Sequence, residues 1–284
     1  MEAVPGGGKQ RAVSRTVLWL GGGFLVLLLG LGFLNLLAPR AVERVFVGAP
    51  TPLPEATPSQ PKAAIIDQTG LSFPTPDFMV EAEAYLVEAG YTVDQYPPEV
   101  LTVDFYRTLP VKGYDLILFQ THATSEVMLE GEDERTSGAA PGPFLFTTEA
   151  YEQQRYLRLQ LEDQVRASRL FFEGSPLLFA LGPKFVQRSM RGTFADTVII
   201  IGGCQSLAVP DLAQAFLDRG ASVVIGWDEM VNLSHNNAAM LSLLEGLTVE
   251  GLSAPEAVER TMEAVGPDPS YNSSLVFLQS ELGS

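Results

Sequence analysis

The stretch "TVIIIGGCQS", residues 197–206, carries the strongest indication of fold in the chain. Its β-branched apolar run is typical of a strand buried on both faces, as in a parallel sheet covered by helices. Two glycines end the run, and Cys204, the only cysteine among 284 residues, follows them. Because a single cysteine has no partner for an intramolecular disulfide, the thiol is either a small core residue or a reactive group.

Further strands and helices alternate around this stretch. The other predicted strands are residues 63–68 (AAIIDQ), 91–96 (YTVDQY), 114–122 (YDLILFQTH) and 222–227 (SVVIGW). The predicted helices are residues 77–89 with Asp77 as cap, a short helix in 102–109, one from Pro210 to Gly220, one capped by Ser234, and one opened by a Ser253–Glu256 capping box. This alternation predicts an α/β domain with a doubly wound, mostly parallel sheet.

The alternation is interrupted at residues 123–196, which we interpret as an insertion within a domain spanning residues 63–284. Residues 124–143 are polar, glycine-rich and acidic and predict a long loop, which is solvated surface, a flap, or a site cut during activation. A helix is expected in residues 151–164, and strands around residues 170–172 and 177–181.

Residues 16–38 (TVLWLGGGFLVLLLGLGFLNLLA) contain no charge over 23 positions, which is long enough to span a bilayer. We predict an uncleaved transmembrane signal anchor there, with a long cleaved signal peptide as the alternative. Three basic residues in residues 1–15 favour a cytoplasmic N-terminus and an extracytoplasmic domain. Residues 39–62 contain six prolines and are expected to form an extended linker.

The charge balance excludes some partners. Five of the 18 basic and two of the 34 acidic residues lie before residue 45, so residues 45–284 carry 13 basic and 32 acidic residues. Such a surface repels phosphate backbones, so no nucleic acid partner is expected. It also favours a basic side chain in any substrate. No metal-ligand spacing or phosphate-binding loop is present, so no metal or cofactor is expected, and the sequence gives no indication of oligomeric state.

Polar residues follow the predicted parallel strands at the edge where ligands bind in open α/β sheets. His122 ends one strand, and Cys204 follows another. An imidazolium beside a thiol favours the nucleophilic thiolate, and the backbone amides of Ala123 and Cys204 would bind an oxyanion. The alternatives are a structural histidine and an inert thiol.

A substrate pocket is expected around the same edge. Its candidate residues are Asp67, Gln205, Trp227, Asp228 and His235. Asp228 would bind a basic side chain or start a turn, Asp67 would face the site or make a structural hydrogen bond, and His235 is also typical of an ordinary helix start.

The segments "LILFQTHA" (116–123) and "TVIIIGGCQS" resemble the two blocks of caspase-like cysteine peptidases, a group that includes caspases, gingipains and CHAT domains. The resemblance covers about residues 63–263. It implies a caspase-like α/β fold, a base at His122, a nucleophile at Cys204, and endopeptidase activity on a protein or peptide substrate at the membrane. Two alternatives stay open: an inactive caspase-like binding or signalling module, and a flavodoxin-like domain that binds a small ligand.

Overall fold

The computed structural model describes residues 60–124, 143–170 and 174–280. The predicted anchor at residues 16–38, nearly all of the linker and nearly all of the predicted loop at residues 124–143 lie outside these ranges. Within the described ranges, no helix is long and apolar enough to cross a membrane. The predicted anchor and its orientation therefore stay predictions.

A mostly parallel six-stranded sheet forms the centre of the described domain, with the strand order β10-β9-β8-β3-β1-β2. Its parallel strands are β1 (Lys62–Asp67), β2 (Thr92–Tyr96), β3 (Leu116–Gln120), β8 (Thr197–Gly202) and β9 (Ala221–Trp227). All five were predicted from the sequence. The sixth strand, β10 (Leu275–Gln279), pairs antiparallel with β9 and was not predicted.

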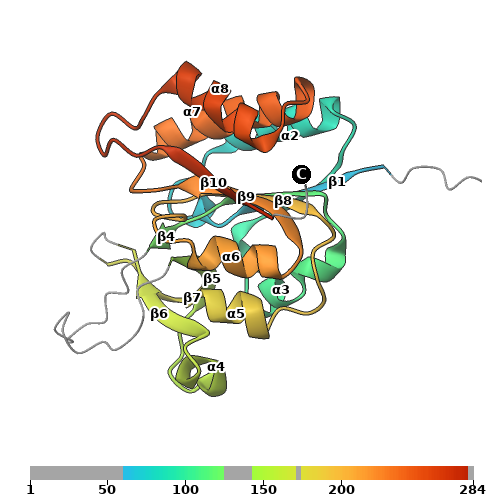
Figure 1. Cartoon of the computed structure of the whole chain (residues 1–284). Helices are drawn as coiled ribbons and strands as arrows, with labels where there is room; N and C mark the ends of the chain where they lie inside the picture. The colour runs from blue at the N-terminus through green and yellow to red at the C-terminus, as the bar shows by residue number, and fades with distance from the viewer. Residues whose placement is uncertain (1–59, 125–142, 171–173, 281–284) are drawn as a thin grey trace, which may run out of the picture. The chain divides into compact units, whose positions relative to one another are not determined.

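Helices cover both faces of this sheet (Figure 1). One face carries α2 (Pro76–Glu88), α7 (Leu233–Leu244) and α8 (Ala254–Val265). The other carries α3 (Val103–Arg107), α5 (Pro183–Arg188) and α6 (Asp211–Asp218). Short 3₁₀ helices η1 (Thr69–Leu71), η2 (Pro98–Val100) and η3 (Leu109–Lys112) and the π-helix η4 (Glu245–Val249) complete the connections.

The inner strands β1, β3, β8 and β9 are mostly apolar because each face of the sheet packs against its own core. In β3, Leu116 and Leu118 join the core under α2 and α7, whereas Ile117 and Phe119 join the core on the opposite face. All four side chains are almost completely buried. A strand buried on both faces has no polar alternation, which explains the continuous apolar runs in the sequence.

The predicted insertion forms a second, four-stranded sheet with the order β4-β5-β7-β6. Its elements are β4 (Ala123–Thr124), β5 (Phe144–Ala150), α4 (Leu157–Leu161), β6 (Val165–Arg169) and β7 (Leu177–Leu181). Leu145, Phe179 and Leu181 pack in the same core as Ile117 and Phe119. The insertion is therefore continuous with the core of the domain on this face.

One predicted strand of the insertion, around residues 170–172, falls mostly outside the described residues, and the described strand before it, β6, ends at Arg169. A second prediction was wrong in extent. The helix expected over residues 151–164 is reduced to the five residues of α4, since Tyr156 and Asp163 have left-handed backbone conformations (φ 54° and 56°) that interrupt it. The Gln160 amide also donates to the carbonyl of Arg155 (2.6 Å), which competes with a continuous helix at this point.

The helix caps were predicted with mixed success. The capping box of α8 is present, with the Ser253 N–H donating to Glu256 Oε2 at 2.9 Å. Ser234, however, is not the cap of α7, because that helix already begins at Leu233. Asn232 occupies the cap position, and its side chain donates to the buried carboxylate of Asp268 (3.0 Å). This hydrogen bond fixes the cap of the helix two residues before the predicted cap.

Candidate active site

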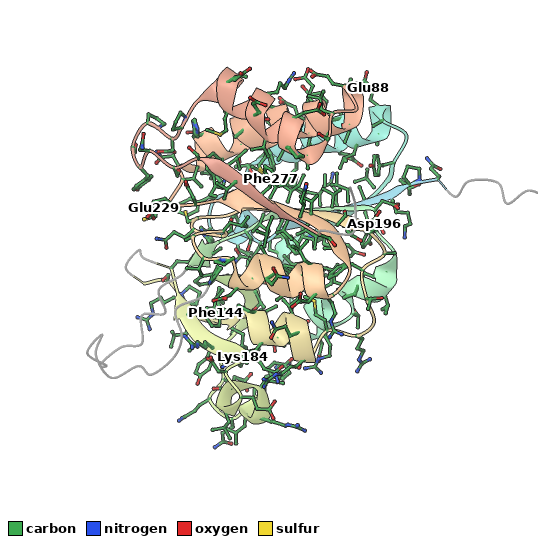
Figure 2. The ribbon with its side chains drawn as sticks, viewed as in Figure 1. Glu88, Phe144, Lys184, Asp196, Glu229 and Phe277 are labelled. Atoms are coloured by element: carbon green, nitrogen blue, oxygen red, sulfur yellow. The ribbon has the colours of Figure 1, made fainter. Side chains whose placement is uncertain are left out.

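His122 and Cys204 follow neighbouring parallel strands at the same register. Gln120 at the end of β3 is paired with Gly202 at the end of β8, and each candidate residue comes two positions later. Glu229, which follows β9, and Asp196, which precedes β8, mark the carboxyl and amino edges of the sheet in Figure 2. Both candidate residues therefore lie at the carboxyl edge.

A cavity of about 180 Å³ at this edge brings the two residues together. Its lining comes from the ends of β1, β3 and β8 and from the segment that leads into α7. The lining residues are Thr69, Phe73, Thr121, His122, Gly202, Gly203, Cys204, Met230, Val231, Asn232, Leu233, Asn236 and Tyr271.

The turn after β8 places Cys204 at the cavity. The Gly203 N–H donates to the carbonyl of Ile201 (3.0 Å), which turns the chain immediately after the strand. A Cβ on Gly203 would lie 2.6 Å from the carbonyl oxygen of Thr121. Only glycine therefore fits this close approach between the two strand ends.

His122 is held through its backbone. Its N–H donates to Gln68 Oε1 (2.7 Å), and its carbonyl accepts from the Phe146 N–H (3.1 Å). The imidazole packs edge-on against Phe73 and Phe146, with ring centroids 5.8 and 6.2 Å apart. Its Nε2 is buried and has no hydrogen-bond partner in the described part of the chain.

Burial determines the protonation of both groups. It lowers the pKa of His122 to about 4, so the imidazole is neutral at pH 7. Burial also raises the pKa of the Cys204 thiol, and the negative charges of Asp268 and Glu229 act in the same direction against opposing backbone hydrogen bonds. The resting site thus holds a neutral thiol and a neutral imidazole, whereas the sequence had suggested an imidazolium beside a thiolate.

The thiol is bonded to a backbone carbonyl in this state. Cys204 Sγ donates to the carbonyl oxygen of Val231 at 3.5 Å, and the described residues show no hydrogen bond between Cys204 and His122. A proton transfer between the two therefore requires the thiol to leave the Val231 carbonyl.

Within the described ranges, neither predicted oxyanion donor, Ala123 or Cys204, gives its backbone N–H to a backbone carbonyl. The bond from Phe146 to the His122 carbonyl makes Ala123 and Leu145 a non-hydrogen-bonded pair, so the Ala123 N–H points away from β5. The Cys204 N–H donates to no backbone carbonyl in the described ranges. The neighbouring amides of His122, Gly203 and Gln205 are all used.

The five predicted pocket residues do not line this cavity. Asp67 Oδ1 accepts from the Gly70 N–H (2.9 Å) and fixes the turn after β1, and burial raises the pKa of its carboxyl. Gln205 donates to Glu229 Oε1 (2.7 Å), and Asp228 Oδ1 accepts from the Ser274 N–H (2.8 Å). Each makes a local structural bond.

Trp227 and His235 also lie beside the cavity and not in its lining. The Trp227 side chain is fully buried, and its indole N–H donates to Asn236 Oδ1 (2.8 Å). His235 Nε2 lies 3.1 Å from the carbonyl oxygen of Gly266, with its ring against Trp227. His235 is therefore placed as an ordinary residue at the start of a helix, which was the alternative given for it.

Buried amides that sequence reasoning missed organise the site instead. Gln68, adjacent to Asp67, accepts from the His122 N–H, and its Nε2 donates to the carbonyl of Thr147 (3.3 Å). Asn236, adjacent to His235, donates to Gln120 Oε1 (3.0 Å) and ties α7 to the end of β3. The signal in the sequence that could have indicated these two amides is that each lies next to a predicted site residue.

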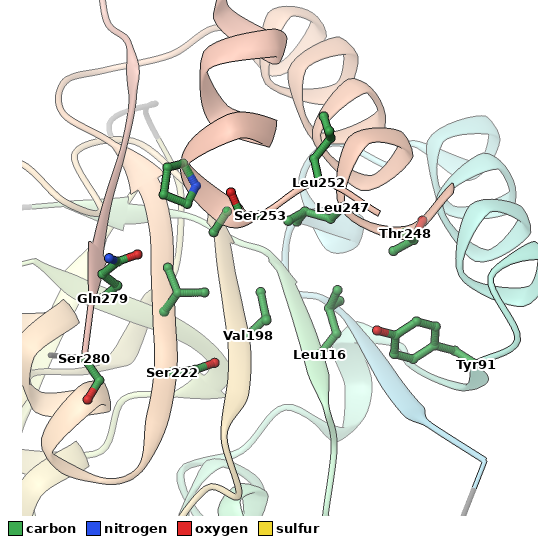
Figure 3. Close-up of a pocket in the computed structure, with 13 residues that line it drawn as sticks. Tyr91, Leu116, Val198, Ser222, Leu247, Thr248, Leu252, Ser253, Gln279 and Ser280 are labelled. Carbon is green, nitrogen blue, oxygen red and sulfur yellow. The ribbon is translucent and has the colours of Figure 1, made fainter. Parts of the chain in front are cut away.

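A second hollow of about 320 Å³ lies at the opposite, amino edge of the sheet (Figure 3). Figure 3 shows Leu116 and Val198 at the starts of β3 and β8 on one side, and Leu247 and Leu252 on the other. Its described lining contains no thiol, imidazole or carboxylate. Within residues 60–124, 143–170 and 174–280, no group of three or more His, Cys, Asp or Glu side chains is placed to hold a metal ion.

Fold and site together define a mixed α/β domain with one thiol and one imidazole at adjacent strand ends. No family model and no curated protein matches the chain. Among solved structures, the Arg-specific cysteine proteinase gingipain R is similar with a TM-score of 0.39 and 12% identity. The similarity covers 72% of this chain but 42% of gingipain R, so the chain spans less than half of that protein's length.

Proposed function

We propose that this protein is a membrane-anchored cysteine endopeptidase of caspase-like fold, with Cys204 as nucleophile and His122 as general base and acid. The observation that carries the proposal is the shared cavity, into which equivalent positions of β3 and β8 bring the only cysteine and one of the two histidines of the chain. Thiol and imidazole at one cavity are the groups that acyl transfer through a thioester requires.

In the proposed reaction, Cys204 rotates from the Val231 carbonyl toward His122 Nε2, which accepts the thiol proton. The thiolate attacks the substrate carbonyl, and the amides of Ala123 and Cys204 donate to the resulting oxyanion. His122 returns the proton to the departing amine, which leaves a thioester on Cys204. Water, deprotonated by His122, then attacks the thioester and releases the carboxylic acid product and the thiol.

The protonation of the resting site means that the thiolate needed for this mechanism has to be generated during the reaction. A neutral pair with a lowered histidine pKa and a raised cysteine pKa has little thiolate at pH 7. In the proposed mechanism the ion pair therefore forms when substrate binds. Once the proton has moved, the imidazolium and the thiolate stabilise each other as counter-ions.

The same resting state supports a second candidate, a catalytically inactive binding module at the membrane. The bond of the thiol to Val231 and the absence of a bond to His122 within the described residues are what such a module would have. A binding module tolerates Cys204→Ala and His122→Asn without loss of function, whereas a peptidase does not.

The test is cleavage of a defined peptide mixture by the full chain in detergent, with new N-termini counted by mass spectrometry. We expect Cys204→Ala to abolish cleavage and His122→Asn to slow it by about 10²- to 10⁴-fold. His235→Asn is the matched control, because it changes the other histidine, which lies outside the cavity lining. Cleavage that survives Cys204→Ala contradicts the proposal, and unchanged peptide binding without any cleavage supports the binding module.

The membrane part of the proposal has its own test. Residues 16–38 are proposed to span the bilayer, with the N-terminus cytoplasmic and the domain extracytoplasmic. The full chain should then remain in the membrane fraction after carbonate extraction. A variant with arginine at Leu27 and Leu28 should be released, and a wild-type chain that is itself released contradicts the anchor.

A further inference from the structure

The cavity beside Cys204 has apolar walls and an aromatic rim. Met230, Val231 and Leu233 contribute its walls, and Val231 is only 9% exposed. Phe73 and Tyr271 are 40% and 44% exposed. In the described part of the chain they are the aromatic side chains with the greatest exposure, and both line this one cavity. Exposed aromatic residues at the opening of one cavity are typical of a surface that binds an apolar group.

The acidic residues of the nearby loops are occupied by donors. Glu229 Oε1 accepts from Gln205 Nε2 (2.7 Å) and from the Met230 N–H (3.0 Å). Asp228 is bonded to the Ser274 N–H. Neither residue lines the cavity, so neither presents a carboxylate to a side chain bound there.

Asp268 is the most strongly bonded of these carboxylates. It is 1% exposed and accepts from the N–H groups of Asn232, Ser270 and Tyr271 at 2.8 to 3.0 Å and from the Asn232 side chain. Its role is to fix the segment that carries Tyr271 against the start of α7. This carboxylate therefore builds the rim of the cavity but does not line it.

A charged substrate side chain would have no counter-ion among the described residues that line this cavity. Among its described lining residues there is no Lys, Arg, Asp or Glu, and His122 is neutral at pH 7. Burying an unpaired charge is strongly unfavourable, whereas an apolar side chain gains from contact with the walls. The local lining thus opposes the basic preference that the overall negative charge suggested.

On the basis of the proposed peptidase function, we infer that the substrate residue whose carbonyl Cys204 attacks has an uncharged, apolar side chain of about the size of leucine or methionine. The volume of about 180 Å³ fits one such side chain together with the reacting carbonyl group. Met230, Val231 and Leu233 contact it, and Phe73 and Tyr271 close over its sides.

The test uses peptidyl acyloxymethyl ketones that differ only in their last residue: leucine, lysine or aspartate. The Cys204 sulfur displaces the carboxylate of such a ketone and forms a stable thioether, so reaction of the full chain in detergent is measured by intact mass. Because the chain has one cysteine, every adduct of this kind is at Cys204. We expect the leucine ketone to react at least about 10-fold faster than either charged ketone.

A variant reverses the preference if the walls determine it. Met230→Glu places a carboxylate in the lining and should make the lysine ketone the fastest of the three. Val80→Glu is the matched control, because it adds the same charge at an apolar residue that is 66% exposed on α2 and lies outside the cavity lining. It should leave the order of the three rates unchanged.

The outcomes separate the two proposals. A lysine or aspartate ketone that reacts fastest with the wild-type chain, in a manner that His122→Asn slows, overturns the apolar preference and leaves the peptidase proposal standing. The absence of any adduct, or adducts that form equally fast in His122→Asn, overturns the peptidase proposal and the preference with it. A fastest leucine ketone together with the reversal in Met230→Glu supports both.

Discussion

Cys204 Sγ lies 3.5 Å from the carbonyl oxygen of Val231, and within the described residues this is the hydrogen bond of the thiol. Val231 belongs to the segment between β9 and α7, which also supplies the walls of the cavity. Within the described residues, the resting thiol is thus bound to the wall of the cavity and not to the imidazole beyond the neighbouring strand. In the free protein the thiol is therefore not part of a preformed thiolate–imidazolium ion pair with His122.

The first prediction concerns thiol reactivity. Iodoacetamide should alkylate Cys204 slowly at pH 7, with a rate that rises above the ordinary thiol pKa of about 8.5, because burial and nearby carboxylates raise the pKa of the thiol. His122→Asn should leave this pH profile of the free protein unchanged. The urea-unfolded chain serves as control and should titrate near 8.5. A plateau below pH 7 that disappears in His122→Asn would show instead that the ion pair exists before substrate binds.

The second prediction concerns acid stability. The pKa of His122 is lowered by burial from 6.5 to about 4, so between these values the unfolded chain binds a proton that the folded chain does not. Stability should therefore fall as the pH decreases from about 6.5 to about 4, by about 3 kcal/mol from this group. Urea unfolding at several pH values measures the effect.

The control for this acid effect is the other histidine. His122→Gln should lose the additional destabilisation in that pH window, whereas His235→Gln should retain it. Equal pH dependence in wild type and His122→Gln would mean that His122 is not the group responsible.

The parallel strands could be predicted because a strand buried on both faces needs a continuous apolar run, and residues 197–202 and 116–120 have no other plausible role. The strand β10 was missed because "LVFLQ" is short and only partly buried. Its position depends on pairing with β9, which is a tertiary contact between segments about 50 residues apart. Local sequence patterns contain no information on such a pairing.

The positions of His122 and Cys204 could be predicted because they depend on the strands alone. Each comes two residues after the end of its strand, so a correct strand assignment places both at one edge of the sheet. The pocket residues were predicted less well because loops depend on individual hydrogen bonds. Asp67 turns into its own loop to bind Gly70, and the adjacent Gln68 faces His122 instead. Tyr271 reaches the cavity through the bonds of Asp268, which no spacing in the sequence indicates.

The third prediction is that Gly203→Ala destabilises the protein and displaces Cys204. The new Cβ would lie 2.6 Å from the Thr121 carbonyl oxygen, so one of the two strand ends must shift. We expect a loss of about 1–3 kcal/mol in urea unfolding, typical of overpacking, and a matching loss of Cys204 reactivity toward peptidyl ketones. Gly246→Ala is the control, since its nearest contact is an ordinary 3.4 Å to Ala257. A Gly203→Ala chain with wild-type stability would refute the close approach.

The fourth prediction concerns Gln68, a positioning residue for His122. Its buried amide accepts from the His122 N–H at 2.7 Å and donates to the Thr147 carbonyl at 3.3 Å. Gln68→Leu leaves both groups unpaired and should cost about 1–3 kcal/mol per unpaired group in urea unfolding, together with a loss of peptide cleavage. Gln214→Leu, at an exposed amide on α6, should change stability by no more than about 0.5 kcal/mol.

A conservative variant separates positioning from packing at Gln68. Gln68→Glu keeps an acceptor for the His122 N–H but loses the donor to Thr147, so it should be destabilised and still cleave peptides faster than Gln68→Leu. Both variants are compared without urea and at the same pH, under conditions in which both are folded. The cleavage rates then reflect the geometry of the site and not the fraction of folded protein. Equal cleavage by Gln68→Leu and wild type would show that the bond to the His122 backbone does not position the imidazole for the reaction.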